Sequence, residues 1–149
     1  MIRLGSLAGY PFEGPRLLVG WTAPAAAAVY AVLYRPRPDT HPEQYAVIYA
    51  GHSDNLAAEG FPFRHPRAGC WTKRAGDRFK VYVAVYDPPG ARAAHREQIT
   101  QELIAAYRPG CNSQQYDQRW EPEWIGSYQA PTADPLTTRK QPPGTGPTT

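Results

Sequence analysis

Two stretches of sequence decide the fold: residues 27–34 read AAVYAVLY and residues 44–51 read QYAVIYAG. Both are continuous apolar runs with β-branched and aromatic residues, and the first lies between Pro24 and the proline-containing segment 35–38. Runs of this length with such borders are typical of buried strands. A third run, FKVYVAVY over residues 79–86, has the same character. The sequence therefore predicts three strands.

Two helices are predicted after the second and third strands. Ser53 or Asp54 is suited to cap a short helix over residues 55–59. A longer helix is predicted over residues 91–107, because its apolar residues recur at the spacing of one helical face. The order of the elements predicts an α+β domain with a small three-stranded antiparallel or mixed sheet flanked by helices. The predicted apolar face of the long helix comprises Ile99, Leu103, Ala106 and Tyr107.

The chain has 149 residues, of which 42% are hydrophobic and 19% are charged, so it suits one globular domain. Residues 1–24 are rich in glycine and proline but contain several large apolar residues, which predicts an irregular arm packed on the core. Residues 25–128 are assigned to the domain itself. Residues 129–149 are rich in proline and threonine and almost without large apolar residues, so we expect a disordered tail.

Other features narrow the class of protein. No apolar run approaches the ~20 residues of a membrane helix, and no signal peptide is recognised, so no membrane partner is expected. Cys70 and Cys111 are the two cysteines, too few for a disulfide scaffold or a four-ligand zinc site. We therefore expect reduced thiols and a cytoplasmic location.

The formal net charge is +3, and basic residues gather in one part of the chain. A cluster of this kind can contact a phosphate backbone, although a solvated basic face has the same composition. Trp71 beside Lys73 and Arg74 can either stack on a base or cover the core. The basic residues of this segment are Arg64, Arg67, Lys73, Arg74, Arg78 and Lys80.

A series of short motifs over residues 27–112 resembles the GIY-YIG nuclease superfamily, whose core is a three-stranded sheet flanked by helices. The segment 60–66, followed by Cys70-Trp71, is similar to a small single-domain bacterial branch of that superfamily. The motifs, in chain order, are Ala28-Val29-Tyr30, Tyr49-Ala50-Gly51, His52-Ser53, Asn55-Leu56, Leu103-Ile104, Tyr107-Arg108-Pro109 and Asn112.

The resemblance implies hydrolysis of phosphodiester bonds with Mg²⁺ or Mn²⁺ as the cofactor. Tyr30 and Tyr49 correspond to the two tyrosines that help to deliver the nucleophile, and Asn112 corresponds to the terminal asparagine. Gly51 lets the backbone pass close to the site. An alternative for both tyrosines is simple packing, since strands of small sheets favour tyrosine.

Two charged positions depart from the family pattern. Glu59 stands where the family has the arginine that stabilises charge on the phosphate, and Thr100 stands where it has the metal-binding glutamate. A carboxylate beside a phosphate repels it, and a threonine does not supply the charge that a magnesium site needs. Relocation of these roles would use Glu97, one helical turn before Thr100, and Arg64 or Arg67.

Three hypotheses follow. The chain is a catalytically impaired nuclease-like domain that binds nucleic acid or another phosphate-bearing ligand, or an active metal-dependent endonuclease with relocated residues, or a fold reused for a small molecule or a protein. His52 and His65 are candidates to move protons or contact phosphate, with a surface or loop-capping role as the alternative. The candidate site comprises the catalytic residues Tyr30, Tyr49 and Glu97, with Glu97 also the metal ligand, and the substrate-binding residues His52, Arg64, Arg67, Lys73, Arg74 and Asn112.

Overall fold

The computed structural model describes residues 1–6, 9–112 and 125–127, the last of these as backbone only. Its helices are α1 (Ala68–Ala75) and α2 (Ala93–Tyr107), with short 3-10 helices η1 (Arg78–Lys80) and η2 (Gly110–Asn112). Its strands are β1 (Ile2–Leu4), β2 (Tyr10–Leu17), β3 (Ala28–Tyr34), β4 (Gln44–Ser53), β5 (Tyr82–Tyr86) and β6 (Ile125–Ser127).

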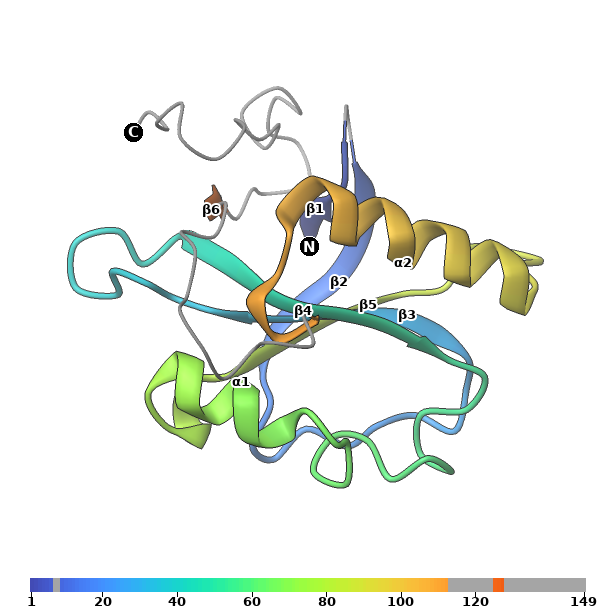
Figure 1. The fold of residues 1–149 in the computed structure, drawn as a ribbon, viewed down its shortest axis with the longest axis horizontal. Helices are drawn as coiled ribbons and strands as arrows, with labels where there is room; N and C mark the ends of the chain where they lie inside the picture. The colour runs from blue at the N-terminus through green and yellow to red at the C-terminus, as the bar shows by residue number, and fades with distance from the viewer. Residues whose placement is uncertain (7–8, 113–124, 128–149) are drawn as a thin grey trace.

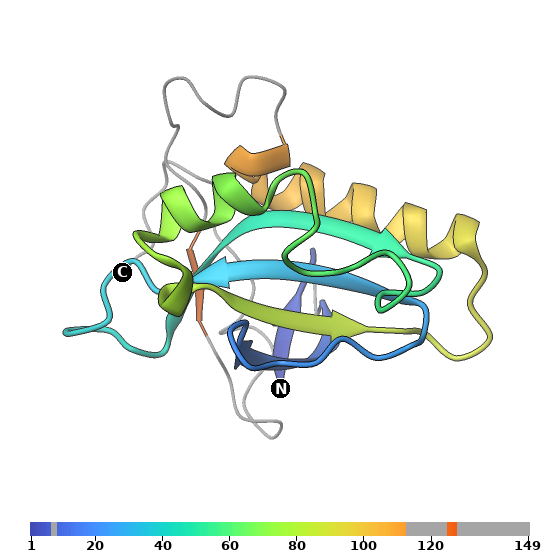
Figure 2. The ribbon, with the colours of Figure 1, turned by 90° about the horizontal axis from the view of Figure 1, so that it is seen from below.

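The strands form one sheet in the order β1-β2-β5-β3-β4-β6, and every neighbouring pair is antiparallel. The helix α2 lies over one face of this sheet and α1 over the other, as Figure 1 shows, and Figure 2 shows the sheet from the side of α1. The predicted α+β class is therefore confirmed. None of the helices in the described ranges is long and apolar enough to cross a membrane.

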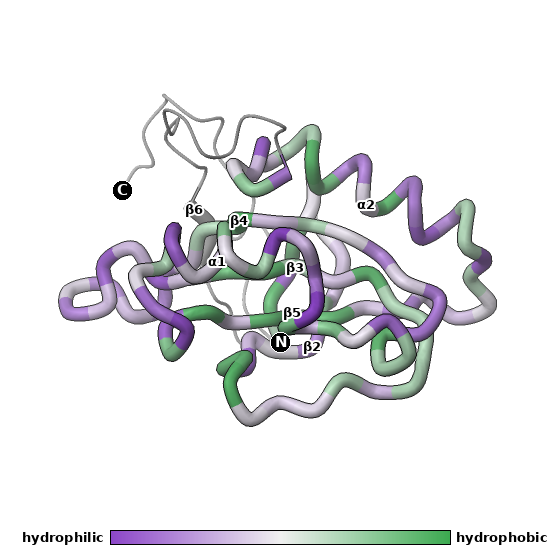
Figure 3. The backbone as a smooth tube through the Cα atoms, turned by 60° about the horizontal axis from the view of Figure 1, so that its bottom comes forward, coloured by the Kyte–Doolittle hydropathy of each residue, from purple (hydrophilic) through white to green (hydrophobic). Residues whose placement is uncertain are grey.

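The central strand β3 is buried on both faces. Val29, Ala31 and Leu33 belong to a cluster with the apolar face of α2, whereas Tyr30 and Val32 belong to a second cluster with α1. Successive side chains of a strand point to opposite faces, so a strand covered on both sides is apolar throughout. The helix α2, in contrast, packs on the sheet with one side only. Figure 3 accordingly shows hydrophobic and hydrophilic residues alternating along its length.

The predicted sheet was too small. The three predicted strands lie next to one another as β5-β3-β4, but β1, β2 and β6 extend the sheet at both edges. The N-terminal arm was predicted to be irregular, and this is wrong for its two strands, because β2 pairs with β5. Backbone pairing with an existing edge satisfies the hydrogen bonds of β2 despite its two prolines. The predicted tail over residues 129–149 lies outside the described residues.

The short helix was predicted at the wrong place. Residues 55–59 form a turn in which Asn55 Oδ1 accepts a hydrogen bond from the Ala58 N–H at 3.0 Å. Gly60, with φ of +76°, turns the chain away after this single turn. The helix lies instead at α1, whose first residues have no side-chain cap. Packing of the buried Trp71 and Cys70 against the sheet stabilises α1, and local capping signals do not reveal this.

The expectation of reduced thiols is wrong. Cys70 in α1 and Cys111 in η2 form a disulfide, with their Cα atoms 5.9 Å apart. Both residues are buried, and they join two segments separated by 41 positions in the sequence. The sequence argument for a cytoplasmic location rested on reduced thiols and loses that basis.

We expect the double variant Cys70→Ala/Cys111→Ala to lower the free energy of unfolding by about 4 kcal/mol. The disulfide closes a loop with a sequence separation of 41 residues, and its loss increases the entropy of the unfolded chain. Denaturant unfolding of the variant and of the oxidised wild type measures the difference. Thiol titration of the denatured, unreduced wild type is the control, and two free thiols there would contradict the disulfide.

Candidate functional site

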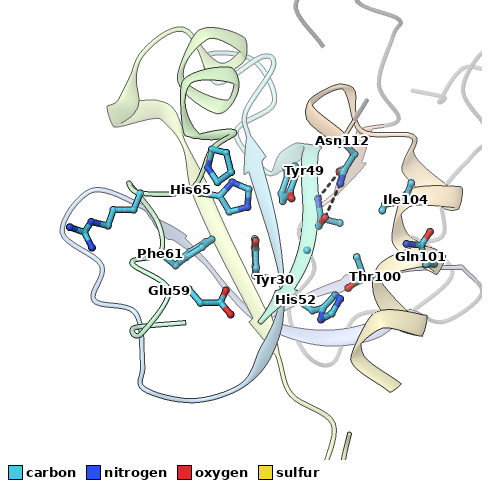
Figure 4. Close-up of a pocket in the computed structure, with 14 residues that line it drawn as sticks. Tyr30, Tyr49, His52, Glu59, Phe61, His65, Thr100, Gln101, Ile104 and Asn112 are labelled. Carbon is cyan, nitrogen blue, oxygen red and sulfur yellow. Dashed lines mark hydrogen bonds between the residues drawn. The ribbon is translucent and has the colours of Figure 1, made fainter. Parts of the chain in front are cut away.

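A cavity of about 400 Å³ opens at the edge of β4, between α2 and residues 59–66. Figure 4 shows that Glu59, Phe61 and His65 line one wall and that α2 lines the opposite wall. Tyr30 and residues 49–52 form the floor, since β3 and β4 are paired at this level of the sheet. The cavity is thus built from segments that lie far apart in the sequence.

Tyr30 and Tyr49 lie together on the floor of the cavity, with ring centroids 6.1 Å apart. Burial raises the pKa of both phenols, and neighbouring Tyr49 and Glu59 raise that of Tyr30 further. Arg67 acts in the opposite direction on Tyr49, because a positive charge favours the phenolate. Both hydroxyls are therefore neutral hydrogen-bonding groups at ordinary pH.

Gly51 is required by the close approach of Tyr30. A Cβ atom on Gly51 would lie 2.6 Å from the hydroxyl oxygen of Tyr30 and 3.0 Å from a ring carbon of Tyr49. Real Cβ atoms do not approach other heavy atoms so closely, and Tyr30 is only 4% exposed. The absence of a side chain at this position is what allows the Tyr30 hydroxyl to reach β4.

Asn112 holds the edge of β4 in place. Its side-chain Oδ1 accepts from the Ala50 N–H at 2.8 Å, and its Nδ2 donates to the Ala50 carbonyl at 2.9 Å. These two bonds, dashed in Figure 4, replace the backbone partners that an adjoining strand would supply. Asn112 was predicted to bind substrate, and the structure uses both ends of its amide to position β4.

His65 has a defined protonation state. Its Nδ1 lies 3.0 Å from the backbone N–H of Arg67 and accepts its hydrogen bond, so the neutral ring carries its proton on Nε2. Burial and, to a smaller extent, the positive charge of Arg67 lower the pKa of His65 to about 4, against a smaller opposing effect of Glu59. His65 therefore caps the loop before α1, as one alternative held, and also lines the cavity as a neutral ring.

The wall formed by α2 carries no carboxylate into the cavity. Thr100 lines it, but its hydroxyl donates to the Arg96 carbonyl at 2.9 Å. Glu97 is exposed and does not line the cavity, so the structure does not bring it to the two tyrosines. Glu102 also points elsewhere, because it accepts a hydrogen bond of 2.6 Å from the Tyr10 hydroxyl.

Within the described part of the chain, two charged side chains line the cavity, Glu59 and Arg64. Arg67 lies nearby, where it donates to the Cys111 carbonyl at 2.6 Å and its charge affects Tyr49 and His65. His52 also lines the cavity, and its Nδ1 is a buried atom without a hydrogen-bond partner in the described structure. The site therefore combines one carboxylate with a positive field from two arginines.

The other predicted residues lie outside the cavity. Lys73 is exposed on α1, and the guanidinium carbon of Arg74 lies 5.3 Å from the centre of the Tyr34 ring. Trp71 is 1% exposed and packs beside Tyr49 with ring centroids 5.5 Å apart, so it covers the core and is not available to stack on a base.

The site residues predicted from the sequence did not include four residues that line the cavity: Phe61, Pro66, Gln101 and Ile104. Phe61 packs 4.4 Å from Tyr30 between ring centroids, which closes the floor of the cavity. Ile104 belongs to the motif Leu103-Ile104 and Phe61 to the quoted segment 60–66, but the motifs did not show that these side chains face the cavity, because this depends on how α2 and residues 59–66 meet across the sheet.

The divalent ion that the resemblance implied does not fit this arrangement. The helix α2 offers no ligand for it. The hydroxyl of Thr100 donates to a backbone carbonyl, Glu97 is exposed outside the cavity, and Glu102 accepts a hydrogen bond from Tyr10. Within residues 1–6 and 9–112, no three His, Cys, Asp or Glu side chains are grouped to hold a metal ion. Hard divalent cations need several oxygen ligands, and Glu59 is the single carboxylate that lines the cavity among the residues that the structure describes. Comparison with known family models, curated proteins and solved structures finds no match to this chain.

We expect Gly51→Ala to lower the free energy of unfolding by about 1–3 kcal/mol, because the new methyl group displaces the packed Tyr30 ring. Thermal or denaturant unfolding measures the effect. Gly69→Ala is the matched control, since a Cβ there meets no atom within 4 Å. The control should leave stability unchanged or raise it by up to about 1 kcal/mol. Equal stability of the two variants would contradict the close approach.

We expect the imidazole of His65 to remain neutral down to about pH 4, as the Nε2–H tautomer. An ordinary histidine titrates near pH 6.5, so between these values the unfolded chain binds more protons than the folded one. The contribution of His65 to stability is therefore complete above about pH 6.5 and falls as the pH is lowered towards 4.

Long-range nitrogen-proton NMR of the ring checks this expectation, and unfolding measured at several pH values checks its consequence. In His65→Gln the dependence of stability on pH over the same window should become shallower. Titration of the His65 ring near pH 6.5 would show that the ring is not held as described.

Proposed function

We propose that this chain is a nuclease-like domain of the GIY-YIG type that binds nucleic acid and has lost the metal-dependent chemistry of that superfamily. The observation that carries the proposal is the pairing of two neighbouring tyrosines, Tyr30 and Tyr49, with a cavity wall that lacks a carboxylate at Thr100. The resemblance of the sequence motifs to that superfamily supports the type of domain, and the absence of a carboxylate at Thr100 supports the loss of hydrolysis.

Several contacts support a nuclease-like origin. The strand with Tyr30 is adjacent to the strand with Tyr49 and Gly51, and the backbone of Gly51 is close enough to Tyr30 to exclude a side chain. Asn112 follows the long helix, and its side chain forms two hydrogen bonds with the backbone of Ala50, which lies between Tyr49 and Gly51. Seven residues of the quoted motifs line one cavity, as expected for a shared ancestral site: Tyr30, Tyr49, Ala50, Gly51, His52, Ile104 and Asn112.

The charge pattern supports impaired hydrolysis. Glu59 lines the cavity where the resemblance calls for an arginine, and a negative charge there opposes the charge that builds up on a phosphate during hydrolysis. The hydroxyl of Thr100 is committed to the Arg96 carbonyl. Neither a charge-stabilising cation nor a metal-binding carboxylate is present at these two positions.

Other groups support retained binding of a phosphate-bearing ligand. Arg64 lines the cavity, the charge of Arg67 reaches Tyr49 and His65, and the Nε2–H of His65 is a neutral donor. Cations and neutral donors of this kind bind phosphate oxygens without requiring a metal ion.

One observation favours the alternative of an active endonuclease, namely that Arg64 reaches the cavity and is available for the relocated arginine role. The other half of that alternative required Glu97, which is exposed and outside the cavity. The third alternative, a small-molecule site, is favoured by the cavity volume of about 400 Å³, which lies in the range of ligand pockets.

The test is fluorescence anisotropy with labelled DNA and RNA oligonucleotides, together with cleavage assays in Mg²⁺ and Mn²⁺. We expect binding that weakens steeply between about 50 and about 200 mM salt, and no cleavage. Arg64→Gln should weaken binding, and Glu59→Gln should strengthen it by removing a repulsive charge at the cavity. Glu43→Gln, an exposed charge outside the cavity, is the matched control for net charge and should have a smaller effect.

Cleavage by the wild type would overturn the impaired reading, and its loss in Glu97→Ala would favour the relocated active site. No binding to any nucleic acid at low salt would overturn the binding proposal and favour a small-molecule or protein ligand.

A further inference from the structure

Two phenylalanines stand out on the surface. Phe63 is 54% exposed and Phe79 is 56% exposed, more than any other large hydrophobic residue in the described part of the chain. An exposed phenylalanine costs solvation free energy, because its ring has no polar atom to offer to water. Two such rings in one continuous segment call for an explanation beyond packing.

Both rings belong to the segment that connects β4 to β5. Phe63 lies in the stretch that lines the cavity, between the lining residues Phe61 and Arg64, and Phe79 lies in η1. Between them runs α1, which at about 1.5 Å per residue spans about 12 Å. Figures 1 and 2 show this segment crossing one face of the sheet with α1 in its middle, and in the chain Phe63 precedes the helix while Phe79 follows it.

Positive charge accompanies both rings. Arg64 follows Phe63 directly and is exposed, and Lys73 is exposed on α1 between them. Phe79 stands between Arg78 and Lys80, and the guanidinium carbon of Arg78 lies 5.2 Å from the centre of its ring. The acidic residue nearest to Phe79 in the sequence is Asp77. Its side chain caps η1, because its Oδ1 accepts a hydrogen bond from the Phe79 N–H at 2.6 Å.

The sequence offered Trp71 as the ring that stacks on a base, and its burial excludes this role. Rings that are exposed and flanked by cations are the form that binds single-stranded nucleic acid, because unpaired bases stack on them while the cations contact phosphates. In a duplex the bases are already stacked on one another, so exposed rings of this kind have no base faces to contact.

We infer that the ligand of this surface is single-stranded nucleic acid, with unpaired bases stacked on Phe63 and Phe79 and its backbone following Arg64, Lys73 and Lys80. This inference rests on the proposed binding of nucleic acid and specifies its class. It extends the proposed binding from the segment beside the cavity to the segment after α1, since Phe63 lies in the chain between the lining residues Phe61 and Arg64, and Phe79 follows the helix. The bound nucleic acid covers both rings and spans several nucleotides.

The experiment measures binding of the full chain to a single-stranded oligonucleotide and to the matched duplex at one low salt concentration. The single strand should bind at least tenfold more tightly. Phe63→Ala/Phe79→Ala should lower its affinity at least tenfold, because stacking on each ring contributes substantially to binding. The salt dependence of single-strand binding should be the same in this variant as in the wild type, since no cation is removed.

Phe63→Tyr/Phe79→Tyr is the matched control, since it retains both aromatic faces and should keep the affinity within about threefold, a change well below the loss of one stacking contact. Thermal unfolding of the alanine variant should match the wild type, because both side chains are exposed. If the wild type binds nucleic acid but the alanine variant binds equally well, or the duplex binds as tightly as the single strand, this inference fails and the proposed function stands. If no nucleic acid binds to the wild type, both fail.

Discussion

The structure depends first on the burial of β3 on both of its faces. With Val29, Ala31 and Leu33 packed towards α2, and Tyr30 and Val32 packed towards α1, the strand lies between two apolar clusters. Each helix buries its apolar residues in one of these two clusters, to which β4 also contributes. The same alternation directs the ring of Tyr30 to the α1 side, where it meets Tyr49 and the close backbone of Gly51.

A second constraint is the attachment of η2 beside the sheet. The disulfide joins Cys111 to α1, Arg67 donates to the Cys111 carbonyl, and Asn112 pairs with Ala50 on β4. A disulfide and hydrogen bonds on both Cys111 and Asn112 thus hold one short 3-10 helix. Together they connect the end of α2, the start of α1 and the edge of β4, so the cavity among these segments is held from several sides.

The chemistry of the cavity follows from what these constraints leave exposed to it. Tyr30 and Tyr49 are neutral hydroxyl groups because burial raises the pKa of each, and His65 is a neutral ring because burial and Arg67 lower its pKa. Glu59 and Arg64 are the charged groups that line the walls. Our proposal of binding without hydrolysis rests on these neutral donors and on the carboxylate of Glu59 beside Arg64, since hydrolysis needs concentrated positive charge at the phosphate.

The three central strands and the long helix can be predicted locally, because residues 27–34, 44–51, 79–86 and 91–107 have strong apolar patterns. The motifs also point to Tyr30, Tyr49 and Gly51. The strands of the N-terminal arm, the position of α1, the disulfide, and the contrast between buried Trp71 and exposed Phe63 and Phe79 become visible in the folded chain alone. Edge pairing, cross-linking and burial depend on contacts between distant segments, and local composition does not encode which segments meet.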